Sequence, residues 1–183
     1  MSNNKKINNV KIAISGKSGC GNTTVSRLIA DVLKIRFINF TFRNLAQEKG
    51  IDFQEVLALA AKDDSWDREV DRRQVELARE KGGCVLGSRL AIWMLPEADL
   101  KVFLTASPEV RAKRIQVREG GSLKGIAKFT AERDRQDTER YKRIYNINND
   151  DYAFADMVID TDPIDPPEIS RQIIAELNRK LSS

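Results

Sequence analysis

Hydrophobic residues follow two patterns along this chain: short continuous apolar runs, and longer stretches with apolar residues three or four positions apart. The runs predict buried strands, and the spaced stretches predict amphipathic helices. Strands are predicted at 10–14, 35–40, 84–88, 100–106 and 156–161. Because helices are predicted between the strands, the pattern favours an α/β fold with a mostly parallel sheet covered on both faces.

Two longer helical stretches interrupt this alternation, at about 41–82 and about 118–148. The first contains "FRNLAQEKG", "FQEVLALAAK" and "WDREVDRRQVELAREKGG", of which the first and last close on glycine, as helices commonly do. Another helix is predicted from Ser107, because a capping hydroxyl before Pro108 is a typical helix start. We therefore expect a single domain over 10–183, preceded by a disordered leader over 1–9.

Composition narrows the class of protein. The chain has 183 residues, of which 41% are hydrophobic and 32% charged, as in soluble globular domains. No apolar run approaches the roughly 20 residues that span a bilayer, and the polar start "MSNNKKINN" is not a signal peptide. The net charge of +4 suits anionic small molecules better than a nucleic-acid groove. We expect a cytoplasmic monomer that binds neither nucleic acid nor membrane.

The residue types exclude two kinds of chemistry. The chain has no histidine, and its two cysteines, Cys20 and Cys84, do not form a pair with metal-ligand spacing. Zinc chemistry and histidine general-base catalysis are therefore excluded.

The stretch "AISGKSGCGNTT" (13–24) resembles a phosphate-binding loop. It matches G-x-x-x-x-G-K-T except that Asn22 stands where the lysine is expected, and it lies between a predicted strand and a predicted helix. Backbone N–H groups and the helix start form an anion cradle that needs no side chain, and Thr23 is placed to ligate magnesium. A glycine-rich turn without a ligand is the alternative. The predicted ATP-binding residues here are Gly16, Lys17, Ser18, Gly19, Cys20, Gly21, Asn22, Thr23 and Thr24.

The missing lysine puts catalysis in question. Losing one preorganised charge in phosphoryl transfer costs on the order of 10²–10³ in rate. Lys17 lies one residue into the loop, and its long side chain can fold back over the phosphates. Two interpretations stay open: Lys17 replaces the missing charge, or it is simply exposed to solvent.

Outside the loop, the chain resembles the cytidylate kinase family of nucleoside-monophosphate kinases. The resemblance rests on "FRNLAQEKG", "DREVDRRQVELA", "GSRLAIWML", "LKVFLTASPEVRAKRIQVREG" and "ERDRQDTERYKRIYNI". It implies a three-layer P-loop NTPase fold with a five-stranded sheet, a monophosphate-binding helical segment at about 41–82 and a lid at about 118–131. It also implies that ATP, with Mg²⁺, phosphorylates CMP or dCMP. The alternatives are a catalytically weak nucleotide-binding sensor or scaffold, and a kinase with a different acceptor.

The resemblance also assigns roles to arginines. Arg43 and Arg89 would hold the acceptor, and Arg89 follows a predicted strand whose carboxyl end should face the ligand. Arg111 and Arg114 would contact ATP, with an arginine stacked on the adenine. Arg118 begins the lid and would clamp phosphates as the lid closes.

Three charged residues at i, i+4 and i+7, Arg133, Asp137 and Arg140, share one face of a predicted helix. They form either a surface ladder of ion pairs or, as the resemblance implies, a substrate clamp. In the clamp, Arg133 grips the transferring phosphate, and Asp137 and Arg140 contact the acceptor. Because a carboxylate accepts from the exocyclic amine of cytosine, Asp137 is the sequence-based candidate for base choice.

The chain departs from the family pattern at two positions. One is Asn22. The other is Gly87 in "VLGSR", where the family usually has an acid that orients magnesium. Both departures affect the ATP-and-metal half of the expected site, whereas the acceptor half is intact.

Overall fold

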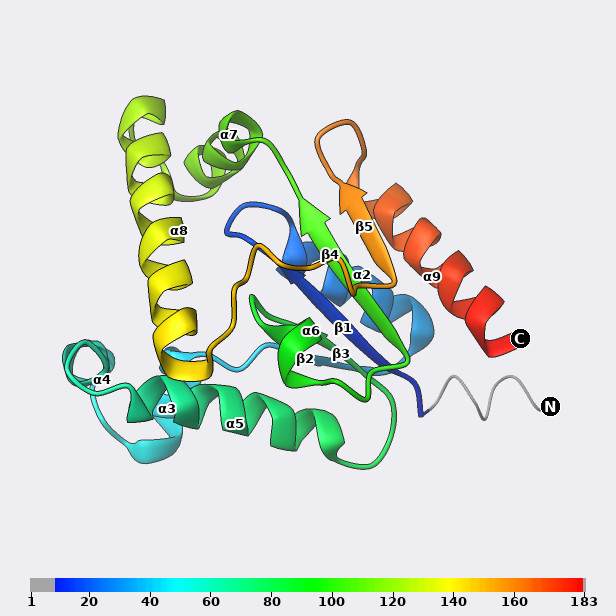
Figure 1. The fold of residues 1–183 in the computed structure, drawn as a ribbon, viewed down its shortest axis with the longest axis horizontal. Helices are drawn as coiled ribbons and strands as arrows, with labels where there is room; N and C mark the ends of the chain where they lie inside the picture. The colour runs from blue at the N-terminus through cyan, green and yellow to red at the C-terminus, as the bar shows by residue number, and fades with distance from the viewer. Residues whose placement is uncertain (1–8, 183) are drawn as a thin grey trace.

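A central sheet of five parallel strands organises the fold (Figure 1), seen in a computed structural model that describes residues 9–182. The strand order is β2-β3-β1-β4-β5, and every neighbouring pair is parallel. The α/β fold predicted from the sequence is therefore confirmed. All but the last residue of the predicted leader lie outside the described residues. The strands are β1 (Lys11–Gly16), β2 (Arg36–Ile38), β3 (Cys84–Gly87), β4 (Leu100–Thr105) and β5 (Met157–Asp160).

Helices fill the connections between strands, and a final helix follows the last strand. They are α2 (Asn22–Leu33), α3 (Phe42–Lys49), α4 (Phe53–Ala60), α5 (Ser65–Arg79), α6 (Ala91–Met94), α7 (Pro108–Glu119), α8 (Leu123–Tyr145) and α9 (Pro166–Ser182). The short α6 was not predicted. The second predicted helical stretch is divided by Gly120 and Gly121, whose φ angles of 77° and 95° end α7 before α8 begins.

Alternation along the strands supplies two apolar layers, one on each face of the sheet. On one face, Ile12 and Ile14 of β1 pack with residues of α2 and α9. On the other, Ala13 packs with residues of β3, α5 and α6. Because successive side chains of a strand point to opposite faces, strands covered on both sides read as continuous apolar runs in the sequence.

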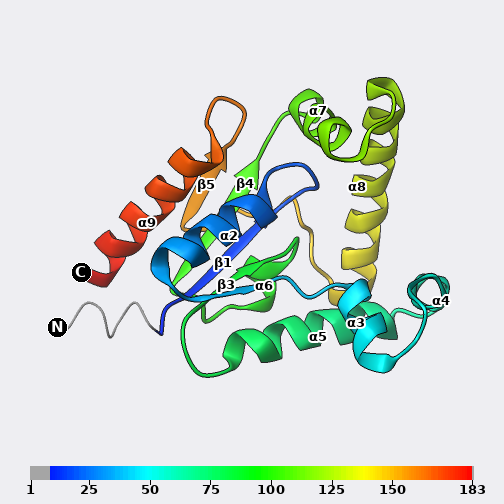
Figure 2. The same ribbon diagram turned by 180° about the vertical axis from the view of Figure 1, so that it is seen from behind.

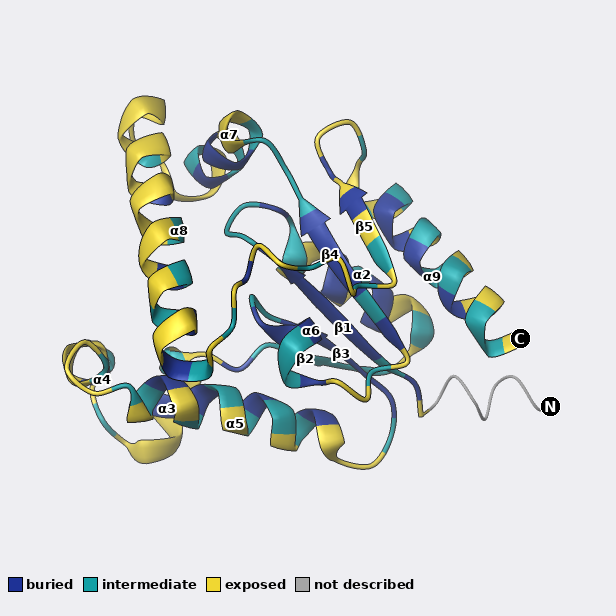
Figure 3. Ribbon diagram, viewed as in Figure 1, coloured by how far each residue is buried: buried dark blue, intermediate teal, exposed yellow. Residues whose placement is uncertain are grey.

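The remaining helices stand beyond the carboxyl edge of the sheet. Helix α8 packs against α7 at its start and reaches α5 at its end, where the Tyr145 hydroxyl donates to Asp71 (Figures 1 and 2). Much of α8 is exposed, whereas the central strands are buried (Figure 3). Over residues 9–182, no helix is long and apolar enough to cross a membrane.

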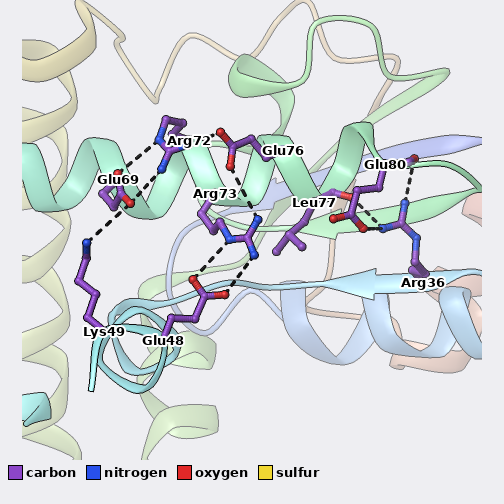
Figure 4. A network of polar contacts seen from close by, with 9 residues as sticks. All are labelled: Arg36, Glu48, Lys49, Glu69, Arg72, Arg73, Glu76, Leu77 and Glu80. Carbon is purple, nitrogen blue, oxygen red and sulfur yellow. Dashed lines mark hydrogen bonds and ion pairs between the residues drawn. The ribbon is translucent and has the colours of Figure 1, made fainter. Parts of the chain in front are cut away.

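The outer face of α5 is fixed by ion pairs (Figure 4). Arg73 pairs with Glu48 of α3 at 3.2 Å, and Arg36 of β2 pairs with Glu80 at 3.0 Å and donates to the Leu77 carbonyl. Exposed pairs contribute little stability one by one. Their geometric effect is to set the rotation of α5, so that its opposite face is turned toward the carboxyl edge of the sheet.

Candidate active site

One cavity of about 890 Å³ opens at the carboxyl edge of the sheet. Its walls come from the loops after β1, β2 and β3 and from α5, α7 and α8. Arg43 and Arg111 do not line it. The predicted site residues that do are Gly16, Lys17, Ser18, Gly19, Cys20, Gly21, Asn22, Thr23, Thr24, Arg89, Arg114, Arg118, Arg133, Asp137 and Arg140.

The loop after β1 has the geometry of an anion cradle. Gly19 and Gly21 have φ angles of 87° and 99°, a left-handed conformation that side chains disfavour. A Cβ on Gly19 would lie 2.9 Å from the Arg111 carbonyl oxygen, so this position also requires glycine for space. Gly21 caps α2, and the helix start therefore faces the cavity, where its free N–H groups favour an anion.

Asn22 is turned back into the loop. Its Nδ2 donates to the Gly16 carbonyl at 2.6 Å, which ties the end of the loop to its beginning. Its Oδ1 is buried and has no hydrogen-bond partner among the described residues. The side chain at this position therefore closes the loop and supplies no positive charge.

Two arginines of α7 hold the loop from behind. Arg111 is buried, its Nε donates to the Ser18 carbonyl at 2.7 Å, and its guanidinium pairs with Asp134 of α8 at 2.7 Å. Arg114 donates to the Gly19 carbonyl at 3.3 Å and to Thr161. In this structure the guanidinium of Arg111 is occupied by the loop and by α8.

Asp137 lies at the centre of an arginine cluster. It is buried, and its two oxygens accept from Arg89 at 2.5 Å and from Arg140 at 2.6 Å. Arg140 also pairs with Asp67 at 3.3 Å. This arrangement is more than a surface ladder, because it links α8 to the loop after β3 and to α5. Asp137 orients both arginines toward the cavity they line.

The remaining cationic side chains of the cavity differ in whether they form an ion pair. Lys17 pairs with Asp150 at 2.6 Å, and Arg118 pairs with Glu119 at 2.5 Å. Arg133 forms no ion pair with any other described residue. Partial burial, and after it the nearby charge of Arg89, lower the pKa of Arg133. A cation in a cavity wall that no ion pair engages is available to a phosphate.

Arg43 lies outside the cavity lining. It is in the first turn of α3, as the sequence suggested, but its guanidinium lies over the Phe53 ring, 4.2 Å from the ring centre. A contact between Arg43 and a ligand in the cavity requires the side chain to leave this ring.

Sequence reasoning missed an acceptor-rich face of α5. Asp67, Asp71 and Gln74 line the cavity at i, i+4 and i+7. Asp71 accepts from Tyr145 at 2.6 Å and from Gln74 Nε2 at 3.2 Å. Burial, opposed by the Tyr145 hydrogen bond, raises the pKa of Asp71 to about 6. The spacing that singled out Arg133, Asp137 and Arg140 is also present in "DREVDRRQ" and could have revealed this face.

Gly87 has no room for a side chain. A Cβ there would lie 2.5 Å from Ser26 Oγ and 2.9 Å from Ser26 Cβ. Ser26 is fully buried within α2, and the helix backbone fixes the position of its Cβ, so a change of side-chain rotamer would not relieve this contact. The acid that the family pattern has at this position is therefore sterically incompatible with Ser26.

Thr23 is the cavity residue that the sequence suggested as a magnesium ligand. Its hydroxyl lines the cavity at the start of α2 and accepts from Asn39 at 3.3 Å. Within residues 9–182 no cluster of three or more acidic, cysteine or histidine side chains could hold a metal by itself. This chemistry fits Mg²⁺ that arrives with a nucleotide, because Mg²⁺ is commonly held by phosphate oxygens and water with few protein ligands.

The parallel sheet, the glycine loop and the cations facing it define a P-loop kinase. Comparison with known proteins gives the family: the sequence matches the cytidylate kinase-like family over residues 11–163. The chain belongs to this family. It is an ATP-dependent kinase with a nucleoside monophosphate kinase role.

Named relatives are similar over most of the chain. "Cytidylate kinase 2" of Borreliella afzelii is 46% identical, over 93% of this chain and 98% of the relative. "Cytidylate kinase" of Methanocaldococcus jannaschii is 42% identical, over 82% of this chain and 87% of the relative. Among solved structures, shikimate kinase from Acinetobacter baumannii shares the fold, with a TM-score of 0.65 at 15% identity over 96% of this chain and 97% of that chain.

The raised pKa of Asp71 predicts that this residue makes the folded protein less stable as pH rises. Ionising this carboxyl is harder in the folded protein than in the unfolded chain, so its contribution to stability falls as pH rises from 3.8 to about 6. About two pKa units correspond to about 3 kcal/mol. The free energy of unfolding of Asp71→Asn, relative to that of the wild type, should therefore increase by up to about 3 kcal/mol between pH 4 and pH 7. Urea unfolding at several pH values measures this difference. Asp31→Asn on the exposed face of α2 is the matched control. A difference that does not change with pH would contradict the prediction.

The packing of Gly87 against Ser26 predicts that the two positions are coupled. Gly87→Ala should lower the free energy of unfolding by about 1–3 kcal/mol, because overpacking forces a buried shift. In a Ser26→Gly background the same substitution should cost clearly less, since both atoms closer than 3.0 Å are removed and only Phe37 Cε2, at 3.4 Å, remains. Chemical denaturation of the double-mutant cycle measures the coupling. Equal costs in both backgrounds would mean that Ser26 does not limit this position.

Proposed function

We propose that this protein transfers the γ-phosphoryl group of ATP to CMP or dCMP, giving ADP and CDP or dCDP. The observation that carries the proposal is that the glycine loop and the cluster of Arg89, Asp137 and Arg140 line one cavity. The loop can hold the phosphates of one nucleotide, and the cluster can hold the phosphate of a second one. The names of the relatives support a cytidine nucleotide as the acceptor.

In the proposed reaction, the backbone N–H groups of the loop hold the β- and γ-phosphates of ATP. Arg89 and Arg140, oriented by Asp137, hold the phosphate of the acceptor. An oxygen of that phosphate attacks the γ-phosphorus, and the bond to the bridging oxygen breaks, so the electron pair leaves with ADP. The attacking oxygen is already ionised, and no side-chain base is needed. Catalysis then consists of positioning and charge neutralisation.

Mg²⁺ is proposed as the partner of ATP, where it would neutralise phosphate charge. The Thr23 hydroxyl would hold it together with phosphate oxygens and water. Asn39, which donates to Thr23 Oγ1, would keep that hydroxyl in place.

Arg133 is the proposed main replacement for the missing lysine, because its charge is free and it lines the cavity. Lys17 is proposed as a second source of charge, once phosphate competes with Asp150. Arg118 would join when the segment 118–131 closes as a lid and excludes water. Arg114 is the proposed contact for the nucleoside part of ATP, and Arg111 supports the loop. Arg43 would reach the acceptor phosphate only after leaving Phe53.

A coupled assay of ADP release tests the proposal over CMP, dCMP, UMP, AMP, GMP and shikimate, each with MgATP. CMP or dCMP should give the highest kcat/KM. Binding of CMP without turnover at high enzyme concentration would instead favour a nucleotide-binding protein with weak or no catalysis. Turnover confined to another acceptor would contradict the proposed substrate.

Comparison of two cations tests the source of the missing charge. Arg133→Met should lower kcat by about 10²–10³, because a preorganised charge on the transferring group is lost. Lys17→Met should lower kcat less, since Asp150 already neutralises Lys17 in the unliganded protein. Circular dichroism checks that both variants fold. The reverse order of effects would assign the charge to Lys17.

A further inference from the structure

An unsatisfied carbonyl group lies in the wall of the cavity on α5. Gln74 is only 5% exposed, and its Oε1 has no hydrogen-bond partner in the part of the chain that the structure describes. A buried carbonyl without a partner lowers stability, so such a group in a ligand cavity indicates that a ligand supplies the missing donor.

The orientation of the Gln74 amide is determined by its neighbours. Asp71 carries only acceptors when it is ionised, and it receives Gln74 Nε2 at 3.2 Å. The other amide atom, Oε1, must then face away from Asp71. The Tyr145 hydroxyl holds the second oxygen of Asp71 at 2.6 Å. The chain Tyr145–Asp71–Gln74 thus offers two kinds of acceptor one turn apart on α5: Gln74 Oε1, which has no partner among the described residues, and the remaining lone pairs of the Asp71 carboxylate.

The surroundings of this pair suit a flat aromatic ring. Phe40, Phe42 and Val70 belong to one apolar cluster and also line the cavity. Val70 lies one turn before Gln74 on the same face of α5. A planar base can pack on these side chains while its polar edge meets α5. The outer face of α5 is held by the ion pairs of Figure 4, which fixes the direction in which the acceptors point.

Asp137, the sequence-based candidate for base choice, is less suited to this task. Both of its oxygens are held by charged guanidinium groups at 2.5 and 2.6 Å, whereas the oxygens of Asp71 accept from the neutral Tyr145 hydroxyl and Gln74 amide. The arginines beside Asp137 suit a phosphate subsite better than a base. Recognition of the base therefore has to come from another part of the cavity wall.

We infer that Gln74 and Asp71 select the acceptor base by receiving the two N–H bonds of an exocyclic amino group, as on carbon 4 of cytosine. Gln74 Oε1 takes one N–H and the Asp71 carboxylate takes the other, while Tyr145 positions Asp71. Uracil has a carbonyl at the same place, and it would face two acceptors. This inference deepens the proposed function and rests on it, because it assumes a nucleoside monophosphate as the acceptor.

The test compares two acceptors that differ only in the amino group: CMP and the monophosphate of 2-pyrimidinone riboside. Wild-type enzyme should favour CMP in kcat/KM by about 10- to 100-fold. Gln74→Met keeps the side-chain length and removes the acceptor. It should lower kcat/KM for CMP by about the same factor and change that for the pyrimidinone less than about threefold.

Two further variants complete the design. Gln47→Met makes the same change on an exposed position of α3 outside the cavity and should leave the preference for CMP intact. Tyr145→Phe keeps the ring and removes the hydroxyl that holds Asp71, so it should reduce the preference by a smaller factor. If Gln74→Met does not fold, Tyr145→Phe decides the question.

The outcomes separate this inference from the proposed function. Suppose that the wild-type enzyme phosphorylates CMP and that Gln74→Met keeps the preference for CMP over the pyrimidinone. This result would overturn the inference and leave the proposed function in place. If Gln74→Met does not fold, an unchanged preference in Tyr145→Phe would have the same meaning. Equal losses on CMP and on the pyrimidinone would also overturn the inference, because they indicate a structural role. Wild-type enzyme that phosphorylates no nucleoside monophosphate would overturn both.

Discussion

The buried guanidinium of Arg111 joins the three parts on which the site depends. Arg111 belongs to α7. Its guanidinium donates to the Ser18 carbonyl in the glycine loop and pairs with Asp134 on α8. The loop therefore keeps its shape because α7 supports it, and α8 stands at a fixed distance from the loop because the same group holds Asp134. Removing one member of a buried ion pair is costly, about 3–5 kcal/mol. The distance between the phosphate cradle and the cluster around Asp137 depends on this contact.

One cavity brings together the parts of the site. They are the backbone N–H groups of the glycine loop, Arg133, the cluster of Arg89 and Arg140 with Asp137 and Asp67, and the acceptors on α5. Both departures from the family pattern belong to this arrangement. Asn22 closes the loop with a hydrogen bond where a charge is expected, and Gly87 leaves room for Ser26 where an acid is expected. Positive charge for the phosphates must then come from other side chains. Arg133 forms no ion pair with another described residue, whereas Lys17 is paired with Asp150.

Much of the fold could be predicted because its signals are local. Each of the five predicted strands overlaps an observed one, with ends that differ by at most two residues, and the sheet is parallel throughout. The strand predicted to 40 ends at Ile38, because Asn39 and Phe40 turn away to line the cavity. The short α6 was missed, since four residues carry no helical period. In the site, the residue spacing predicted the glycine loop and the arginines of α8. Asp71 and Gln74 were not predicted, because most of the residues around them in α5 are also charged or polar.

The sequence by itself determined the strand–loop–helix unit at the glycine loop, the order of the secondary structure and the family, because these depend on residue types that are near one another along the chain. Only the tertiary structure decided which cations are free. Arg111 and Arg133 are both arginines on predicted helices, yet one is buried under the loop and the other is unpaired at the cavity. That difference arises from contacts between residues 23 or more positions apart, such as Arg111 with Asp134 and Lys17 with Asp150. Spacing along one helix cannot encode such contacts.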